Sequence, residues 1–90
     1  MIVYVISWLR QTDGTTPTNG VNLNAYNTEE DAKKGLEEFL NDERDLWISS
    51  PDDKNSLTVS INDDGMYGVL HDRWYTDTLI AKILDVEVVQ

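Results

Sequence analysis

The chain opens on a run in which apolar residues occupy both alternating faces of an extended strand. This run is Ile2–Leu9, and its two faces carry Ile2, Tyr4, Ile6 and Trp8 on one side and Val3, Val5 and Leu9 on the other. Such a pattern is typical of a strand that is covered on both faces and paired along both edges. We therefore expect this strand to lie at the centre of a small sheet, with the rest of the chain arranged around it.

A turn-rich segment separates this run from a second strand. Gln11–Gly20 (QTDGTTPTNG) is rich in residues that favour turns, and it predicts a surface loop. In Val21–Tyr26 the apolar residues Val21, Leu23 and Ala25 alternate with the remaining positions. This period of two predicts a half-buried strand that returns antiparallel beside the first.

An amphipathic helix is predicted next. Asn27 or Thr28 is the expected N-cap, and with Thr28 as the cap, Asp31 takes the N3 position of a capping-box-like arrangement. The helix should run to about Asp42, with Gly35 permitting close approach to the sheet. Its apolar stripe, which should pack on the sheet, consists of Ala32, Leu36, Phe39 and Leu40.

The charges on this helix are unevenly arranged. Glu29 with Lys33 and Glu30 with Lys34 form i,i+4 pairs in the favourable orientation. Past these pairs the exposed side becomes acidic, and Arg44 alone relieves it.

The second half of the chain is rich in strand signals. After the helix, Leu46–Ile48 is a short apolar group that either tucks under the core or forms a brief strand, and 49–56 reads as a loop. Leu57–Ile61 alternates in polarity, Asp64 and Gly65 tolerate positive φ, and Met66–Leu70 leads away, which together predict a hairpin.

The last part of the chain predicts two elements. His71–Asp77 is polar, with two large aromatic residues. From Thr78, apolar residues at helical spacing predict a short helical turn, and from Leu84 to Val88 strict alternation predicts a closing strand that pairs with the first. The whole chain is thus expected to form a single α+β domain over residues 1–90, with a mixed or antiparallel sheet of four or five strands and one main amphipathic helix packed on one face.

The composition narrows the classes of partner. Seventeen Asp and Glu against seven Lys and Arg give a formal net charge of −10, which works against direct binding to nucleic acid or to an anionic membrane. The chain has no cysteine, so that disulfides and thiolate metal sites are excluded and a reducing cytosol is a fitting environment. No basic leader and no run of membrane-spanning length is visible, and we expect a cytoplasmic protein.

The sequence contains no pattern that indicates catalysis, a metal or a cofactor. His71 is the only histidine, and beside Asp72 it reads as a surface residue. Asn62–Gly65 and Asp52–Asn55 superficially suggest calcium, but neither continues into the ligand spacing of an EF-hand loop. We therefore expect a protein that is not an enzyme and that needs no cofactor.

Two interpretations of the acidity stand. In one, the helix charge is a solvated face that keeps a small domain soluble, and the aromatic residues belong to the core. In the other, the carboxylates bind the Lys and Arg sites with which a nucleic-acid-handling protein holds phosphates, and thereby obstruct that protein. The residues expected at such a partner-binding surface are Glu30, Asp31, Glu37, Glu38, Asp42, Glu43, Asp45, Trp74 and Tyr75.

In size, acidity and lack of catalytic motifs the chain resembles the small phage-encoded inhibitors of bacterial defence, such as anti-CRISPR proteins and other DNA mimics. Locally, NAYNTEEDAKKGLEEFL followed by LTVSINDDGMYGVL is similar to the Imm1-type immunity proteins, with Thr28, Asp64 and Gly65 as the positions that align. The first resemblance implies a nucleic-acid-handling enzyme of the host cytoplasm as target, and the second implies a cognate toxin neutralised by binding. A monomer and a homodimer joined through an exposed sheet edge are both compatible with the sequence.

Overall fold

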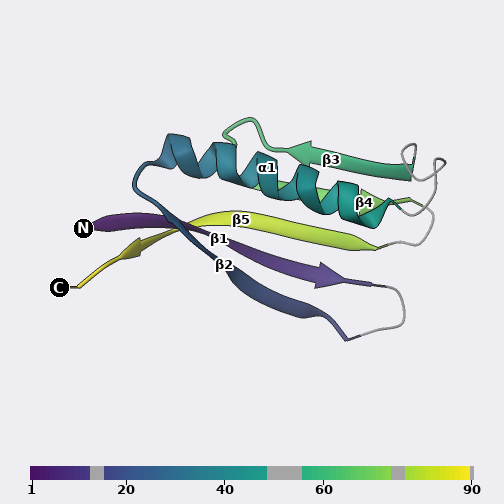
Figure 1. The fold of residues 1–90 in the computed structure, drawn as a ribbon, viewed down its shortest axis with the longest axis horizontal. Helices are drawn as coiled ribbons and strands as arrows, with labels where there is room; N and C mark the ends of the chain where they lie inside the picture. The colour runs from purple at the N-terminus through teal and green to yellow at the C-terminus, as the bar shows by residue number, and fades with distance from the viewer. Residues whose placement is uncertain (13–15, 49–55, 74–76, 90) are drawn as a thin grey trace.

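Five antiparallel strands form one open sheet, and a long helix lies across one face of it (Figure 1). The computed structural model describes residues 1–12, 16–48, 56–73 and 77–89. The elements in chain order are β1 (Ile2–Gln11), β2 (Thr18–Tyr26), α1 (Glu29–Trp47), β3 (Leu57–Ile61), β4 (Tyr67–Asp72) and β5 (Thr78–Glu87). The α+β fold expected from the sequence is confirmed, with every strand pair antiparallel.

The strand at the centre of the sheet is β5, in the order β2-β1-β5-β4-β3. β1 lies between β2 and β5, so the prediction that it is paired along both edges is confirmed. The prediction that β1 is the central strand is wrong, because β1 is the second strand of the sheet, next to the central β5. The prediction that its chain neighbour β2 returns antiparallel is also confirmed.

The core fills the space between α1 and one face of the sheet. Opposed residues of antiparallel strands point to the same face, and on the α1 side these include Ile6 opposite Ile83 and Leu70 opposite Leu79. The predicted stripe of α1 packs against them, with Ala32, Leu36 and Leu40 fully buried and Phe39 half-buried. Together they form one contiguous cluster, as a two-layer domain of this size requires.

No described element covers the other face of the sheet, which we call the open face. It carries Val3, Val5, Ser7 and Leu9 of β1, Ile80, Lys82, Leu84 and Val86 of β5, and Tyr67, Val69 and His71 of β4. The prediction that both faces of β1 are covered is therefore wrong, because α1 lies over one face only. Likewise in β2, the apolar Val21, Leu23 and Ala25 are exposed, whereas Asn22 and Tyr26 are half-buried.

β5 corrects the prediction of a helical turn from Thr78. The segment is one continuous ten-residue strand, with Leu79, Ala81 and Ile83 buried in alternation against the core. Ile80 and Leu84 occupy the opposite face, and this second apolar set produced the misleading helical spacing. The predicted pairing of the closing strand with β1 is confirmed over the full length of β1.

α1 begins where the sequence predicts and ends later. The Thr28 hydroxyl accepts a hydrogen bond from the Asp31 backbone N–H at 3.2 Å, which confirms Thr28 as the N-cap. The helix runs to Trp47, five residues past the predicted end at Asp42. Trp47 and Ile48 pack against the core, which confirms for these two residues the predicted alternative that Leu46–Ile48 tucks under the core. The alternative of a brief strand is wrong, because Leu46 and Trp47 lie within the helix, and Leu46 is exposed.

The β3–β4 hairpin forms as predicted around Gly65, whose φ is +75°. Asn62 and Tyr67 close the turn through a backbone hydrogen bond of 2.9 Å from the Asn62 N–H to the Tyr67 carbonyl. The Asp64 carboxylate accepts a hydrogen bond from the Met66 N–H at 3.0 Å. Asn62–Gly65 is thus a hairpin turn, whereas the second calcium-like segment, 52–55, lies outside the described residues.

Candidate functional site

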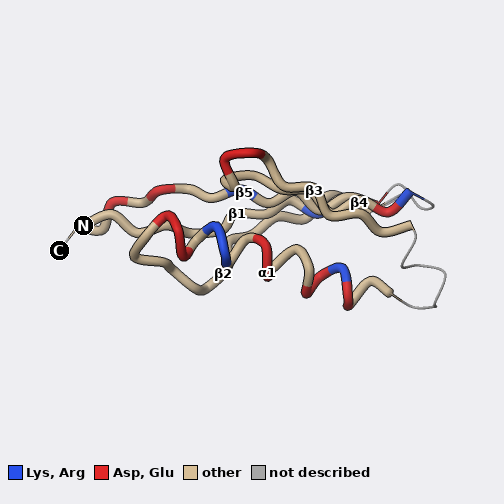
Figure 2. Tube along the Cα trace, turned by 90° about the horizontal axis from the view of Figure 1, so that it is seen from above, with Lys and Arg blue, Asp and Glu red and all other residues tan. Residues whose placement is uncertain are grey.

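The carboxylates of the described chain gather on α1 and at the ends of the sheet (Figure 2). α1 carries eight acidic residues against three basic ones. Asp85 and Glu87 lie opposite Tyr4 and Ile2, which places them on the α1 side of the sheet. Among the described strand positions of the open face there is no carboxylate. The two faces of the domain therefore differ sharply in charge.

Four exposed carboxylates follow one another along the outer side of α1. Asp31, Glu38, Asp42 and Asp45 are separated by seven, four and three residues. These intervals are close to whole turns of an α-helix, so the four residues form a line about 21 Å long, which we call the acidic stripe. Because all four side chains are exposed, their charges are available to a partner.

Basic side chains offset the charge on another flank of the helix. The Lys33 ammonium lies 3.3 Å from a Glu29 carboxylate oxygen and 4.0 Å from one of Glu30. This confirms the predicted Glu29 pair, whereas Glu30 contacts Lys33 instead of the predicted Lys34. A Cβ at Gly65 would lie 3.1 Å from the Lys33 chain, so this flank of the helix adjoins the β3–β4 turn.

Within the described residues, no ion pair of 4.0 Å or less joins a basic side chain to the acidic stripe. Lys34 is the cation next to it, since it lines the same shallow hollow as Glu38 and Asp42. Carboxylates at one-turn spacing repel one another, by a few tenths of a kcal/mol for each i,i+4 pair. Glu38 and Asp42 form one such pair. A cationic partner would remove this repulsion as it binds.

A groove lies between the C-terminal half of α1 and strands β1 and β2. Its volume is about 160 Å³. The residues that line it are Trp8, Arg10, Asn22, Phe39, Glu43 and Leu79. An apolar cavity of about 150 Å³ accommodates a benzene ring, so this groove has room for one ring-sized side chain.

Trp8 and Trp47 make contacts that position the walls of the groove. The Trp8 ring packs against Gly20 of β2, where a Cβ would lie 2.7 Å from the indole, so that the absence of a side chain at Gly20 lets the ring lie flat on β2. The Arg10 guanidinium stacks on the Trp47 ring, 4.9 Å from its centroid. The groove therefore combines apolar walls with one cation and one carboxylate, that of Glu43.

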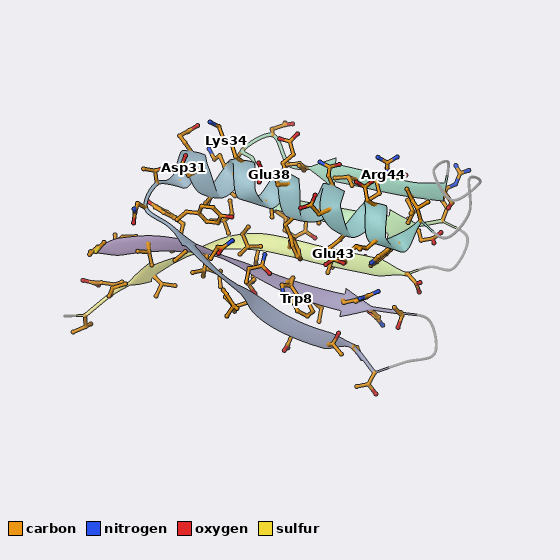
Figure 3. All side chains as sticks on the ribbon, viewed as in Figure 1. Trp8, Asp31, Lys34, Glu38, Glu43 and Arg44 are labelled. Carbon is orange, nitrogen blue, oxygen red and sulfur yellow. The ribbon has the colours of Figure 1, made fainter. Side chains whose placement is uncertain are left out.

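The structure divides the predicted partner-binding acids into three groups. Asp31, Glu38, Asp42 and Asp45 form the acidic stripe. Glu30 and Glu37 lie toward the flank that carries Lys33 and Arg44. Glu43 is half-buried and turns toward Trp8, on the side of α1 away from Arg44 (Figure 3). The predicted aromatic contacts, Trp74 and Tyr75, lie outside the described residues.

Trp8 and Phe39 were not predicted at a binding surface. Both read from the sequence as core residues, because each falls in an apolar pattern of its own element. The available signal was Asn22, a polar residue at a position of β2 that faces α1. A polar residue at an inward position indicates that the two layers do not close fully there.

Other candidate chemistry is sparse. His71 is exposed on the open face, opposite Thr58 and Thr78. Within the described residues, no group of three or more His, Asp and Glu side chains could hold a metal ion. In that same part of the chain, no helix has an apolar stretch sufficient to cross a bilayer.

Comparisons of this chain with protein-family models, with curated proteins and with solved structures find no match.

Proposed function

We propose that the protein is a non-enzymatic binding protein that docks its acidic stripe onto a basic surface of a partner protein and obstructs that surface. The observation that carries the proposal is the stripe itself, four exposed carboxylates without an ion pair to any described residue, beside a groove with apolar walls. Charge supplies long-range attraction and orientation, and burial of a side chain in the groove supplies affinity.

The stripe suits a surface that normally holds phosphates. One strand of a nucleic acid presents a charge about every 3.4 Å along the helix axis, and proteins meet it with rows of Lys and Arg. A line of carboxylates about 21 Å long can occupy such a row. The net charge of −10 steers the protein toward it. In its narrower form, the proposal makes the partner a nucleic-acid-handling enzyme, as the resemblance to anti-CRISPR proteins implies.

The groove gives the docking a specific anchor. Trp8, Phe39 and Leu79 offer apolar walls to an inserted side chain. The carboxylate of Glu43 can accept hydrogen bonds from a cationic head group, while Arg10 is engaged with Trp47. A long Arg or Lys side chain of the partner fits this chemistry, because its stem is apolar and its head is charged.

A pull-down from host lysate with two matched variants tests the proposal. The stripe variant is Glu38→Gln/Asp42→Asn/Asp45→Asn, and the control is Glu29→Gln/Glu30→Gln/Glu37→Gln. Each removes three negative charges from the same helix by near-isosteric changes. The control also removes the ion pairs of Lys33 with Glu29 and Glu30, so circular dichroism must show that both variants are folded. At about 50 mM salt, we expect the wild type and the control to capture the same protein and the stripe variant to capture none. At high salt, we expect the wild type and the control to lose this capture as well.

The identity of the captured protein then separates the target classes. Enrichment of nucleic-acid enzymes supports the narrower proposal. Capture of one toxin, encoded beside this protein and neutralised by it, supports an immunity function instead. Binding that is indifferent to salt, or that both variants weaken equally, contradicts docking through the stripe.

A further inference from the structure

The open face of the sheet carries a band of apolar side chains on β2, β1 and β5, and its margins are polar, with Asn19, Gln11, Thr78, His71, Thr58 and Ser60. Large apolar side chains remain accessible on it, with Leu84 at 37 %, Leu9 at 40 %, Val86 at 41 % and Val21 at 55 % of full exposure. Register places these residues on one face, since Leu9 lies opposite Ile80, Leu84 opposite Val5, and Val21 of β2 opposite Ser7. A contiguous apolar face of this kind is uncommon on an isolated domain and marks a site of interaction.

The size of this face suits a specific protein interface. β1 and β5 are ten residues long. The five strands together hold 40 residues, which at about 3.3 Å per residue and about 4.8 Å between strands gives a flat area of roughly 630 Å². Specific complexes bury about 600–1,000 Å² on each partner, so the whole open face corresponds to the lower end of this range.

Charge indicates which occupant fits. Two copies of a chain with a net charge of −10 repel wherever their carboxylates meet, and contact through α1 would oppose eight carboxylates to eight. The open face holds none at its described strand positions, and its central charge is Lys82. The helix layer lies about 10 Å behind the sheet, beyond the screening length of about 8 Å at physiological salt.

The centre of the open face is hollowed. A shallow depression of about 310 Å³ is lined by Ser7, Trp8, Leu9, Asn19, Tyr67, Ile80 and Lys82. Ser7 is the small residue between the larger pairs, which leaves room for a side chain from a facing sheet. The Lys82 stem adds apolar surface to this depression.

We propose that a second copy of this chain covers the open face, sheet against sheet, about a two-fold axis. Such a dimer has four layers in the order helix, sheet, sheet, helix, and its two sheets pack about 10 Å apart. The two acidic stripes then lie on opposite outer surfaces, so that each remains free. This inference stands on the open face alone and does not depend on the function of the stripe.

Sedimentation equilibrium of the full chain between about 1 µM and 1 mM tests the dimer. We expect the wild type to reach twice its mass of 10.3 kDa. Leu84→Asp places a charge within the interface and should weaken dimerisation at least about tenfold. Leu46→Asp is the matched control, because Leu46 is 77 % exposed but lies on α1, and this variant should dimerise as the wild type does. Val86→Lys provides a second disruption at the periphery of the face.

Circular dichroism confirms that each variant is folded, and the salt series distinguishes this surface from the stripe. Dimerisation should persist or tighten at high salt, whereas docking through the stripe should weaken. A wild type that stays monomeric at about 1 mM overturns the proposal, as does a folded Leu84→Asp variant that dimerises like the wild type. The proposal is also wrong if the wild type is monomeric and captures a lysate protein that the Leu84→Asp variant does not capture. In that case a different partner covers the face.

Discussion

Gly35→Ala tests whether α1 is seated on β2 as the structure describes. Gly35 is buried in the middle of α1, and the Tyr26 ring at the end of β2 occupies the place that a Cβ would take. In an open helix position, the change from Gly to Ala stabilises by about 1 kcal/mol. Here the methyl group would overlap the hydroxyl and the ring carbon that bears it. The ring must move, and overpacking of this kind costs about 3 kcal/mol at the upper end of its usual range.

The net expectation is a loss of about 2 kcal/mol, out of a total of roughly 5–13 kcal/mol for a domain of this length. With a urea dependence of about 1.5 kcal/mol per M, the unfolding midpoint should fall by about 1.3 M. In a Tyr26→Ala background the overlap is gone, and the same change should stabilise by up to about 1 kcal/mol. The sign of the effect therefore depends on Tyr26.

Urea unfolding of the four proteins in this double-mutant cycle measures the coupling. We expect about 3 kcal/mol between the two sites. If Gly35→Ala stabilises the wild type, or has the same effect in both backgrounds, Tyr26 does not contact Gly35. The groove bounded by α1 and β2 would then have another shape.

Three further predictions use the same measurement. Thr28→Ala should lower stability by about 1 kcal/mol through loss of the N-cap, and Thr28→Ser should retain most of it; equal losses would contradict the cap. Gly65→Ala should cost about 1 kcal/mol because φ is positive there, and Gly65→Asn should cost less; the reverse order would be inconsistent with this turn. Asp42→Lys should raise stability by about 0.5 kcal/mol, since it places a cation between Glu38 and Asp45, yet should weaken partner capture; unchanged capture would show that the stripe is not the docking surface.

The elements that the sequence predicts correctly are those with strong local signals. The Thr28 cap and the Leu36 stripe define the start and the buried side of α1, and Gly65 defines the turn of the hairpin. Each depends on residues within one or two turns of chain, where spacing alone decides the geometry. These three predictions therefore do not depend on how the helix and the sheet pack together.

The errors in β1 and β5 share one physical source, the open face. β1 is apolar on both sides and so reads as a covered strand, although α1 covers only the side of Ile6. In β5, Ile80 and Leu84 add a second apolar set to the buried one, and short apolar runs do not distinguish helix from strand by periodicity. A facing second copy would bury both sets, which accounts for the misleading pattern and for the exposed face together.

The sequence predicts that the candidate site is acidic, but it does not predict how the acidic residues line up or that a groove lies beside them. That α1 carries the acids follows from the sequence, but the stripe depends on the helix continuing to Trp47, which brings Asp45 into line with Asp42. That extension depends on the packing of Trp47 against the core and on Arg10, which are contacts distant in the chain. The groove likewise depends on how β2 and α1 meet, which no local pattern contains.

The separation of charge between the two faces is tested most directly by an NMR titration of the full isotope-labelled chain with a decalysine peptide. Amide shifts followed at low salt report where a polycation binds. We expect saturable shifts along Asp31, Glu38, Asp42 and Asp45 and in the adjoining groove, with the open-face strands unchanged and the response lost at high salt. Shifts spread evenly over both faces, or centred on the β3–β4 turn, would contradict the account.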